Sequence, residues 1–68
     1  MDAEAEVRKA EEELAYLRGF LVGVDKKLSN ERFVAGAPPQ VLETERKKKS
    51  DAESKIKALE ERIGQLAG

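Results

Sequence analysis

The sequence of 68 residues has no cysteine, no histidine and no tryptophan, and its aromatic residues are one Tyr and two Phe. The missing cysteines exclude disulfides and thiolate nucleophiles, and the missing histidines exclude imidazole acid–base catalysis. Both absences also remove the usual ligands of zinc and other transition metals. We therefore expect no catalytic residue, no bound cofactor and no metal site in this chain.

Long apolar runs are also missing, since no segment approaches the ~20 apolar residues that cross a bilayer. The first residues, MDAEAEVRKAEEE, are acidic and helix-forming, unlike a signal peptide. We expect no contact with a membrane and a cytoplasmic location. The helical pattern is already under way at the first residues, so we expect Met1 to open a piece of a longer protein.

Charged residues make up 40% of the chain and aromatic residues only 4%. A compact globular core needs more large apolar side chains than this composition offers, whereas a long helix or coiled coil does not. The apolar residues also follow a strict heptad, with alternating steps of three and four, as in helices that pack along one seam. In the first half they are Val7, Ala10, Leu14, Leu17, Leu21, Val24 and Leu28. In the second half they are Leu42, Ala52, Ile56, Leu59, Ile63 and Leu66, with Glu45 and Lys49 at the intervening positions.

The segment between the two heptad patterns, SNERFVAGAPPQ, contains residues that end and restart helices. Ser29 and Asn30 favour caps, and Gly36 offers a left-handed backbone conformation. Pro38 and Pro39 block a continuous helix but suit a first helical turn. We predict one domain over 1–68, with a helix over 3–28, a tip loop over 29–37 and a helix over 38–66. One short helical turn is expected from Asn30 to Val34 within the tip.

The two apolar patterns match each other in antiparallel order, because facing positions have a constant index sum of 69 or 70. This register pairs Val7 with Ile63 and Leu14 with Ile56. In this register the first helix begins and the second helix ends at the same end of the hairpin, opposite the tip. The predicted fold class is therefore all-α, an antiparallel two-helix coiled-coil hairpin, about 40 Å long for 26 residues at 1.5 Å each. One thin seam gives little stability, so the chain on its own is expected to self-associate.

Basic residues concentrate around the predicted tip. Residues 26–49 contain seven basic and three acidic residues, a net charge of +4, whereas the remainder carries six basic and eleven acidic residues, a net charge of −5. Such a basic end attracts phosphate groups. The candidate RNA-binding residues are Lys48, Lys47, Arg46, Lys49, Lys26, Lys27 and Arg32.

Other residues in or beside the seam have less specific interpretations. Glu45 and Lys49 are spaced for an intrahelical ion pair within a polar layer of the seam. Phe33 is expected to close the hairpin as an apolar plug. Tyr16 and Phe20 flank the seam and are free to pack against another surface.

The segment Lys26–Lys48 resembles the tip of the C-terminal coiled-coil arm of valyl-tRNA synthetases. The resemblance rests on the ten positions Leu28, Ser29, Asn30, Phe33, Val34, Ala37, Pro38, Val41, Glu45 and Arg46. It implies an arm that contacts the outer corner of tRNA, where the D and T loops meet, and it places Lys48 at a basic position on that interface. It also implies that ATP-dependent attachment of valine occurs in a catalytic domain outside this chain.

Two alternatives share the predicted architecture. A coiled-coil module for protein–protein interaction or dimerisation would need no RNA. The N-terminal hairpin of a seryl-tRNA synthetase is also an antiparallel helix pair, but it lacks the SNERFVAGAP tip.

Overall fold

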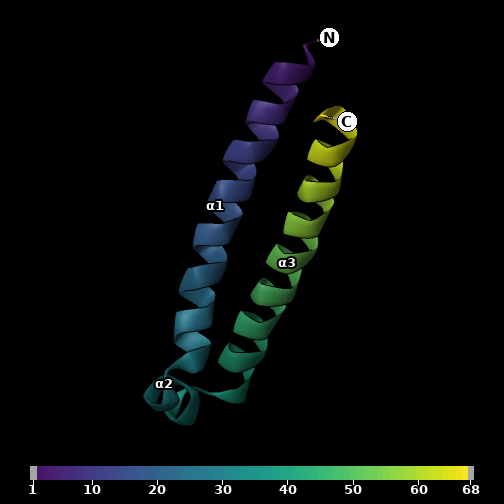
Figure 1. Ribbon diagram of the computed structural model, residues 1–68. Helices are drawn as coiled ribbons and strands as arrows, with labels where there is room; N and C mark the ends of the chain where they lie inside the picture. The colour runs from purple at the N-terminus through teal and green to yellow at the C-terminus, as the bar shows by residue number, and fades with distance from the viewer. Residues whose placement is uncertain (1, 68) are drawn as a thin grey trace.

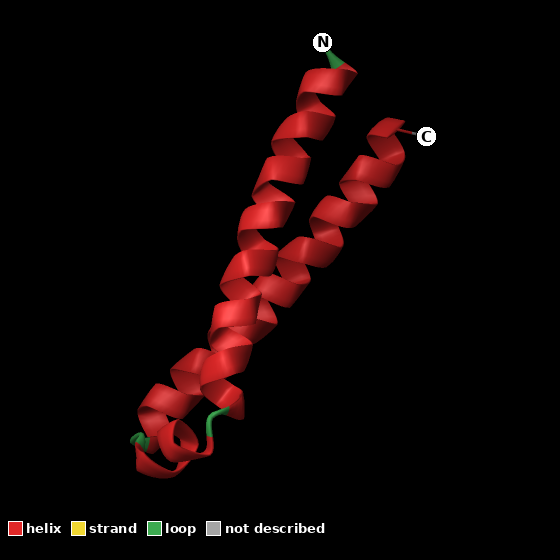
Figure 2. Ribbon diagram, turned by 60° about the vertical axis from the view of Figure 1, so that its left-hand side comes forward, coloured by secondary structure: helices red, strands yellow, loops and turns green. Residues whose placement is uncertain are grey.

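A computed structural model describes residues 2–67, and it consists of three helices. Helix α1 spans Ala3–Ser29, α2 spans Glu31–Gly36 and α3 spans Pro39–Ala67. Helices α1 and α3 lie side by side and antiparallel, with α2 at the end where the chain turns back (Figure 1). Within 2–67 there is no strand, and the second view agrees (Figure 2). The predicted all-α hairpin is confirmed.

Helix α1 has stabilising groups at both of its ends. The Asp2 side chain accepts hydrogen bonds from the backbone N–H groups of Glu4 and Ala5, which have no partner inside the helix. Acidic residues in the first turn and Lys26 and Lys27 in the last turn have the signs that the helix dipole favours at each end.

The tip contains a helix of its own where a loop with one short turn was predicted. Asn30 leaves the helical conformation, with φ −82° and ψ 107°, and its side chain accepts hydrogen bonds from the N–H groups of Arg32 and Phe33. Asn30 therefore ends α1 and caps α2. The prediction of a left-handed Gly36 is wrong, because this residue is the last of α2 and no glycine described has a positive φ. An extended Ala37 leads instead into Pro38 and Pro39, where α3 begins.

The seam between α1 and α3 is the core of the molecule. Every predicted seam residue is buried or half-buried. The most buried apolar residues are Ala10, Leu14, Leu17, Val24 and Ala52, at 3–8% exposure. Shallow hollows along the rod join Ala3 with Leu66, Ala10 with Leu59, and Leu17 with Ala52. These pairs agree with the predicted register.

The arm measures 50 × 15 × 14 Å, longer than the predicted length because α2 extends the tip and α3 has 29 residues. It exposes 5338 Å², compared with about 4,200 Å² for a compact protein of this mass. No side chain described is fully buried. The fold is therefore a thin rod that presents a long surface at the cost of a small core. None of the helices described is long and apolar enough to cross a membrane.

Candidate nucleic-acid interface

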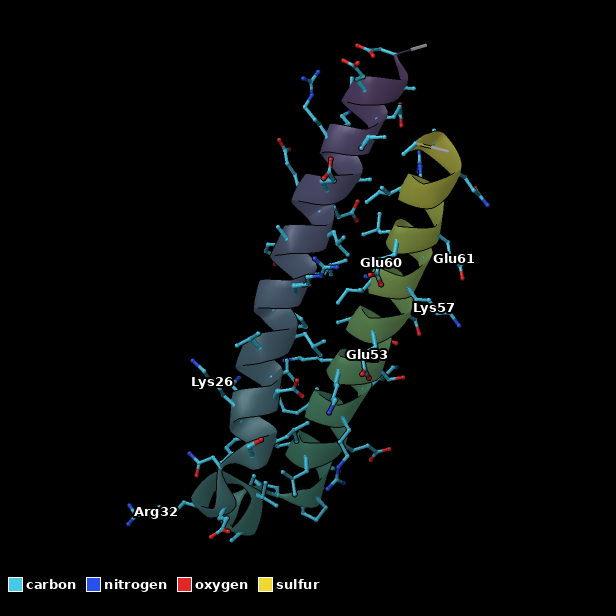
Figure 3. The ribbon with its side chains drawn as sticks, viewed as in Figure 1. Lys26, Arg32, Glu53, Lys57, Glu60 and Glu61 are labelled. Carbon is cyan, nitrogen blue, oxygen red and sulfur yellow. The ribbon has the colours of Figure 1, made fainter. Side chains whose placement is uncertain are left out.

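All seven candidate basic residues lie in the half of the rod that contains the tip. They come from three elements: the last turn of α1, the first turn of α2, and one turn of α3 at Arg46–Lys49. Lys26 projects from α1 on the side away from α3, and Arg32 projects sideways from α2 at the tip (Figure 3). Four successive residues of a helix point in different directions, because each turns by about 100° from the last. Positive charge therefore surrounds the tip half.

One carboxylate lies in the middle of this positive region. Glu45 is the only charged residue among those described that is buried, at 6% exposure. Its Oε1 atom pairs with the ammonium groups of Lys27, at 3.5 Å, and Lys48, at 3.4 Å. Both nitrogens lie close to the same oxygen, so they are within about 7 Å of each other. Glu45 thus brings a lysine from α1 and a lysine from α3 to one place.

The second oxygen of this carboxylate, Oε2, is buried and has no hydrogen-bond partner in the described structure. An unsatisfied buried oxygen destabilises the fold by roughly 1–3 kcal/mol. The hairpin is therefore less stable around Glu45 than it would be with an apolar side chain at this seam position.

The predicted ion pair between Glu45 and Lys49 is wrong. Glu45 reaches Lys27 and Lys48, while Lys49 pairs across the seam with Asp25 of α1, at 3.0 Å. Hydrogen bonding to Asp25 and its charge raise the pKa of Lys49 above the usual value, with Glu53 adding to the effect against slight desolvation. Each of these two seam residues therefore has a partner on the facing helix, Lys27 for Glu45 and Asp25 for Lys49.

The remaining four candidates, Lys26, Arg32, Arg46 and Lys47, are exposed and form no ion pair within residues 2–67. No carboxylate described lies within ion-pairing distance of their charged groups. In the other half of the rod, Arg18 pairs with Glu60 and Arg62 with Glu6, at 3.2 and 2.9 Å. Ion pairs between the two helices therefore occur in both halves of the rod, and four of the seven candidate basic residues take no part in any ion pair described.

The hollow next to Lys48 was not predicted from the sequence. Tyr16 and Phe20 of α1 line it on one side, and Lys48 and Lys55 of α3 line it on the other. Lys48 and Lys55 are one heptad apart and so lie on one face of α3, a spacing that could have indicated the site. Phe33, by contrast, is half-buried in α2, which packs against α1.

No group of acidic side chains that could hold a metal ion occurs in the described part of the chain. Glu60 lies on the side of α3 that faces α1, where it pairs with Arg18, whereas the neighbouring Glu61 points away (Figure 3). These two carboxylates therefore do not form the facing pair that acid–base catalysis requires.

Comparison with known proteins gives one consistent result. The family model described as "Valyl tRNA synthetase tRNA binding arm" matches residues 2–67. The chain is 54% identical over 66 residues to a valine–tRNA ligase of Parabacteroides distasonis, covering 97% of this chain and 8% of that protein. It is 55% identical over 67 residues to the enzyme of Christiangramia forsetii, covering 98% of this chain and 8% of that protein. For the enzyme of Enterococcus faecalis the identity is 44% over 66 residues, again 97% and 8%. No solved structure matches the chain.

Proposed function

The chain belongs to the valyl-tRNA synthetase tRNA binding arm family, and we propose from this membership that it holds tRNA for a valine–tRNA ligase of which it forms one domain, residues 1–68. It spans about 8% of the length of the curated relatives that it matches. ATP binding and the attachment of valine therefore belong to the rest of the ligase in this proposal. The arm supplies contacts to the outer corner of a valine-specific tRNA, in the cytoplasm.

The positive tip is the observation that carries the proposal. Residues 26–49 have a net charge of +4 in a chain whose total is −1. Lysine and arginine side chains bind the phosphates of a nucleic acid largely by releasing its counterions, and this term is independent of base sequence. A rod that places free basic groups around its end can contact a curved RNA backbone from several directions. The proposed contact residues are Lys48, Lys47, Arg46, Lys49, Lys26, Lys27 and Arg32.

The seven basic residues differ in how readily each can bind a phosphate. Lys47 is exposed and has no ion-pair partner among the described residues, so it can meet a phosphate without losing an existing interaction. Lys27 and Lys48 each share Oε1 of Glu45, and Lys49 pairs with Asp25. A phosphate would have to compete with these carboxylates. Lys47 is thus expected to contribute more than Lys49.

The test reverses charge at the tip of the intact ligase. We expect the double variant K47E/K48E to raise KM for tRNA at least tenfold, because two attractive contacts become repulsive. Activation of valine with ATP should be unchanged, since no tRNA is needed for that step. Aminoacylation kinetics and ATP–pyrophosphate exchange measure the two quantities separately.

A charge-matched control lies on the same helix. Lys57 is exposed, ten residues from Lys47, and points away from α1 (Figure 3). Ten residues correspond to about 15 Å of helix. K57E should leave KM for tRNA nearly unchanged, whereas K47E alone should raise it. Equal effects of K47E and K57E would contradict a tip-centred interface, whereas no effect of either variant would favour a protein-binding coiled coil.

A further inference from the structure

The hollow beside Lys48 is lined by two of the three aromatic residues of the chain, Tyr16 and Phe20. Neither ring fills the seam, because the seam residues of this part of α1 are Leu14, Leu17 and Leu21. Tyr16 is 71% exposed and Phe20 is 39% exposed. Both rings therefore keep exposed surface beside the seam.

A small seam residue creates the hollow. Ala52 faces Leu17 and is 3% exposed. Its short side chain leaves space on the surface of α3 between the side chains of Lys48 and Lys55. The two aromatic residues stand opposite, one helical turn apart on α1. The result is a shallow site that has ring surfaces on one side and ammonium groups on the other.

The charges around the hollow favour a nucleic acid. Lys48, Lys55 and Asp51 line it and give it a net charge of +1. The two lysines are seven residues apart, or about 10 Å along the helix, a length that covers more than one phosphate of an RNA strand. Lysine is depleted in the cores of protein–protein interfaces, whereas exposed aromatic residues beside basic groups are typical of sites where nucleobases stack.

The hollow also continues toward the tip. Lys48 lines a second depression, together with Val41 and Thr44, in the first turns of α3. Val41 is 40% exposed. One side of the rod therefore carries aromatic, basic and small apolar groups in succession, and Lys48 connects the hollow with the basic tip.

The geometry points to a stacking site: Tyr16 and Phe20 receive an exposed nucleobase of the bound tRNA, while Lys48 and Lys55 neutralise the phosphates next to it. This inference rests on the proposed function and adds the side of the arm that faces the RNA. It assigns a role to three residues, Tyr16, Phe20 and Lys55, that lie outside the basic set at the tip.

The experiment measures binding of tRNA to the intact ligase. The double variant Y16A/F20A should raise Kd for tRNA about tenfold, within the range measured for loss of one stacked base. The slope of log Kd against log salt concentration should stay the same, because stacking releases no counterions. Y16F keeps the ring and should bind as the parent does. V22A removes an exposed apolar side chain that does not line the hollow, and it should have no effect.

The outcomes separate this inference from the proposed function. An unchanged Kd for Y16A/F20A with a raised KM for K47E/K48E would overturn the stacking site and leave the tRNA-binding arm intact. Failure of K47E/K48E to change tRNA kinetics would remove the proposed function itself. A lower melting temperature of Y16A/F20A without tRNA, together with an unchanged Kd, would show that the two rings serve the fold of the protein, which also overturns the inference.

A crosslink provides a direct second readout. A photoreactive p-benzoyl-phenylalanine in place of Tyr16 should crosslink to tRNA in the intact ligase, and the same residue in place of Val22 should not. Crosslinks to protein alone from position 16 would contradict the stacking site.

Discussion

Glu45 introduces a carboxylate at a seam position equivalent to those of Ala52 and Leu59, one and two heptads further along α3. Burial of a charge is unfavourable unless partners compensate it, and here the partners are the ammonium groups of Lys27 and Lys48. Both lysines are about half exposed, with side-chain exposures of 57% and 47%. Solvent screening weakens these two pairs, so they offset only part of the desolvation of Glu45.

Replacement of Glu45 by leucine is therefore expected to stabilise the arm. E45L removes a buried oxygen that has no partner and leaves behind only lysines that already reach water. A gain of about 1 kcal/mol in the free energy of unfolding is expected, which corresponds to a rise of roughly 4–8 °C in melting temperature for a domain of this size. Thermal melts followed by circular dichroism measure this shift.

The matched control for E45L is E43L, the same substitution at an exposed position two residues earlier. E43L should change the melting temperature little, because leucine there stays in contact with water. A lower melting temperature for E45L than for the parent chain would mean that the pairs with Lys27 and Lys48 contribute more than the burial costs. In that case the carboxylate stabilises the hairpin.

At the scale of the helices, the sequence predicts the seam and the register well because both follow from a simple period. Every residue placed in the seam is buried or half-buried, and Leu17 meets Ala52 as the index sum requires. Ion-pair partners were not predictable in this way. Lys49 is four residues from Glu45 along α3, but the choice of Asp25 depends on how the two helices face each other. The conformation of Gly36 was likewise not predictable, and the residue is helical. A glycine can adopt the left-handed conformation, but nothing in its own chemistry requires it.

The break between α1 and α2 depends on one side chain. Asn30 Oδ1 accepts hydrogen bonds from the N–H groups of Arg32 and Phe33, at 3.0 and 3.2 Å. N30A removes this cap, and loss of an N-cap costs about 1 kcal/mol. Because α2 has only six residues, we expect local opening rather than unfolding of the arm. Hydrogen exchange at the amides of Arg32 and Phe33 should accelerate about fivefold.

N30D serves as the control for this prediction, since an aspartate at the same position can accept the same two hydrogen bonds. Its exchange rates should stay close to those of the parent chain. Exchange in the middle of α1, near Leu14, should be unaffected in both variants. Uniform acceleration along the whole of α1 would show that Asn30 supports the entire hairpin.

At the scale of the whole molecule, the rod has charges of opposite sign in its two halves. The tip half carries +4 and the remainder −5. The core between the helices is thin, and four residues with large apolar side chains, Tyr16, Phe20, Val22 and Val41, are 39–71% exposed. Two copies aligned tip to base would bring opposite charges together and cover some of this apolar surface.

Self-association of the isolated arm is accordingly expected, and it should be salt-sensitive. The melting temperature should rise with protein concentration over a hundredfold range, because the associated form gains stability by mass action. Raising the salt concentration should reduce this dependence, since screening weakens attraction between exposed charges. Sedimentation equilibrium at low and high salt measures the mass directly. A monomer mass at every concentration, with a constant melting temperature, would show instead that four interhelical ion pairs and one narrow seam are sufficient for a stable rod.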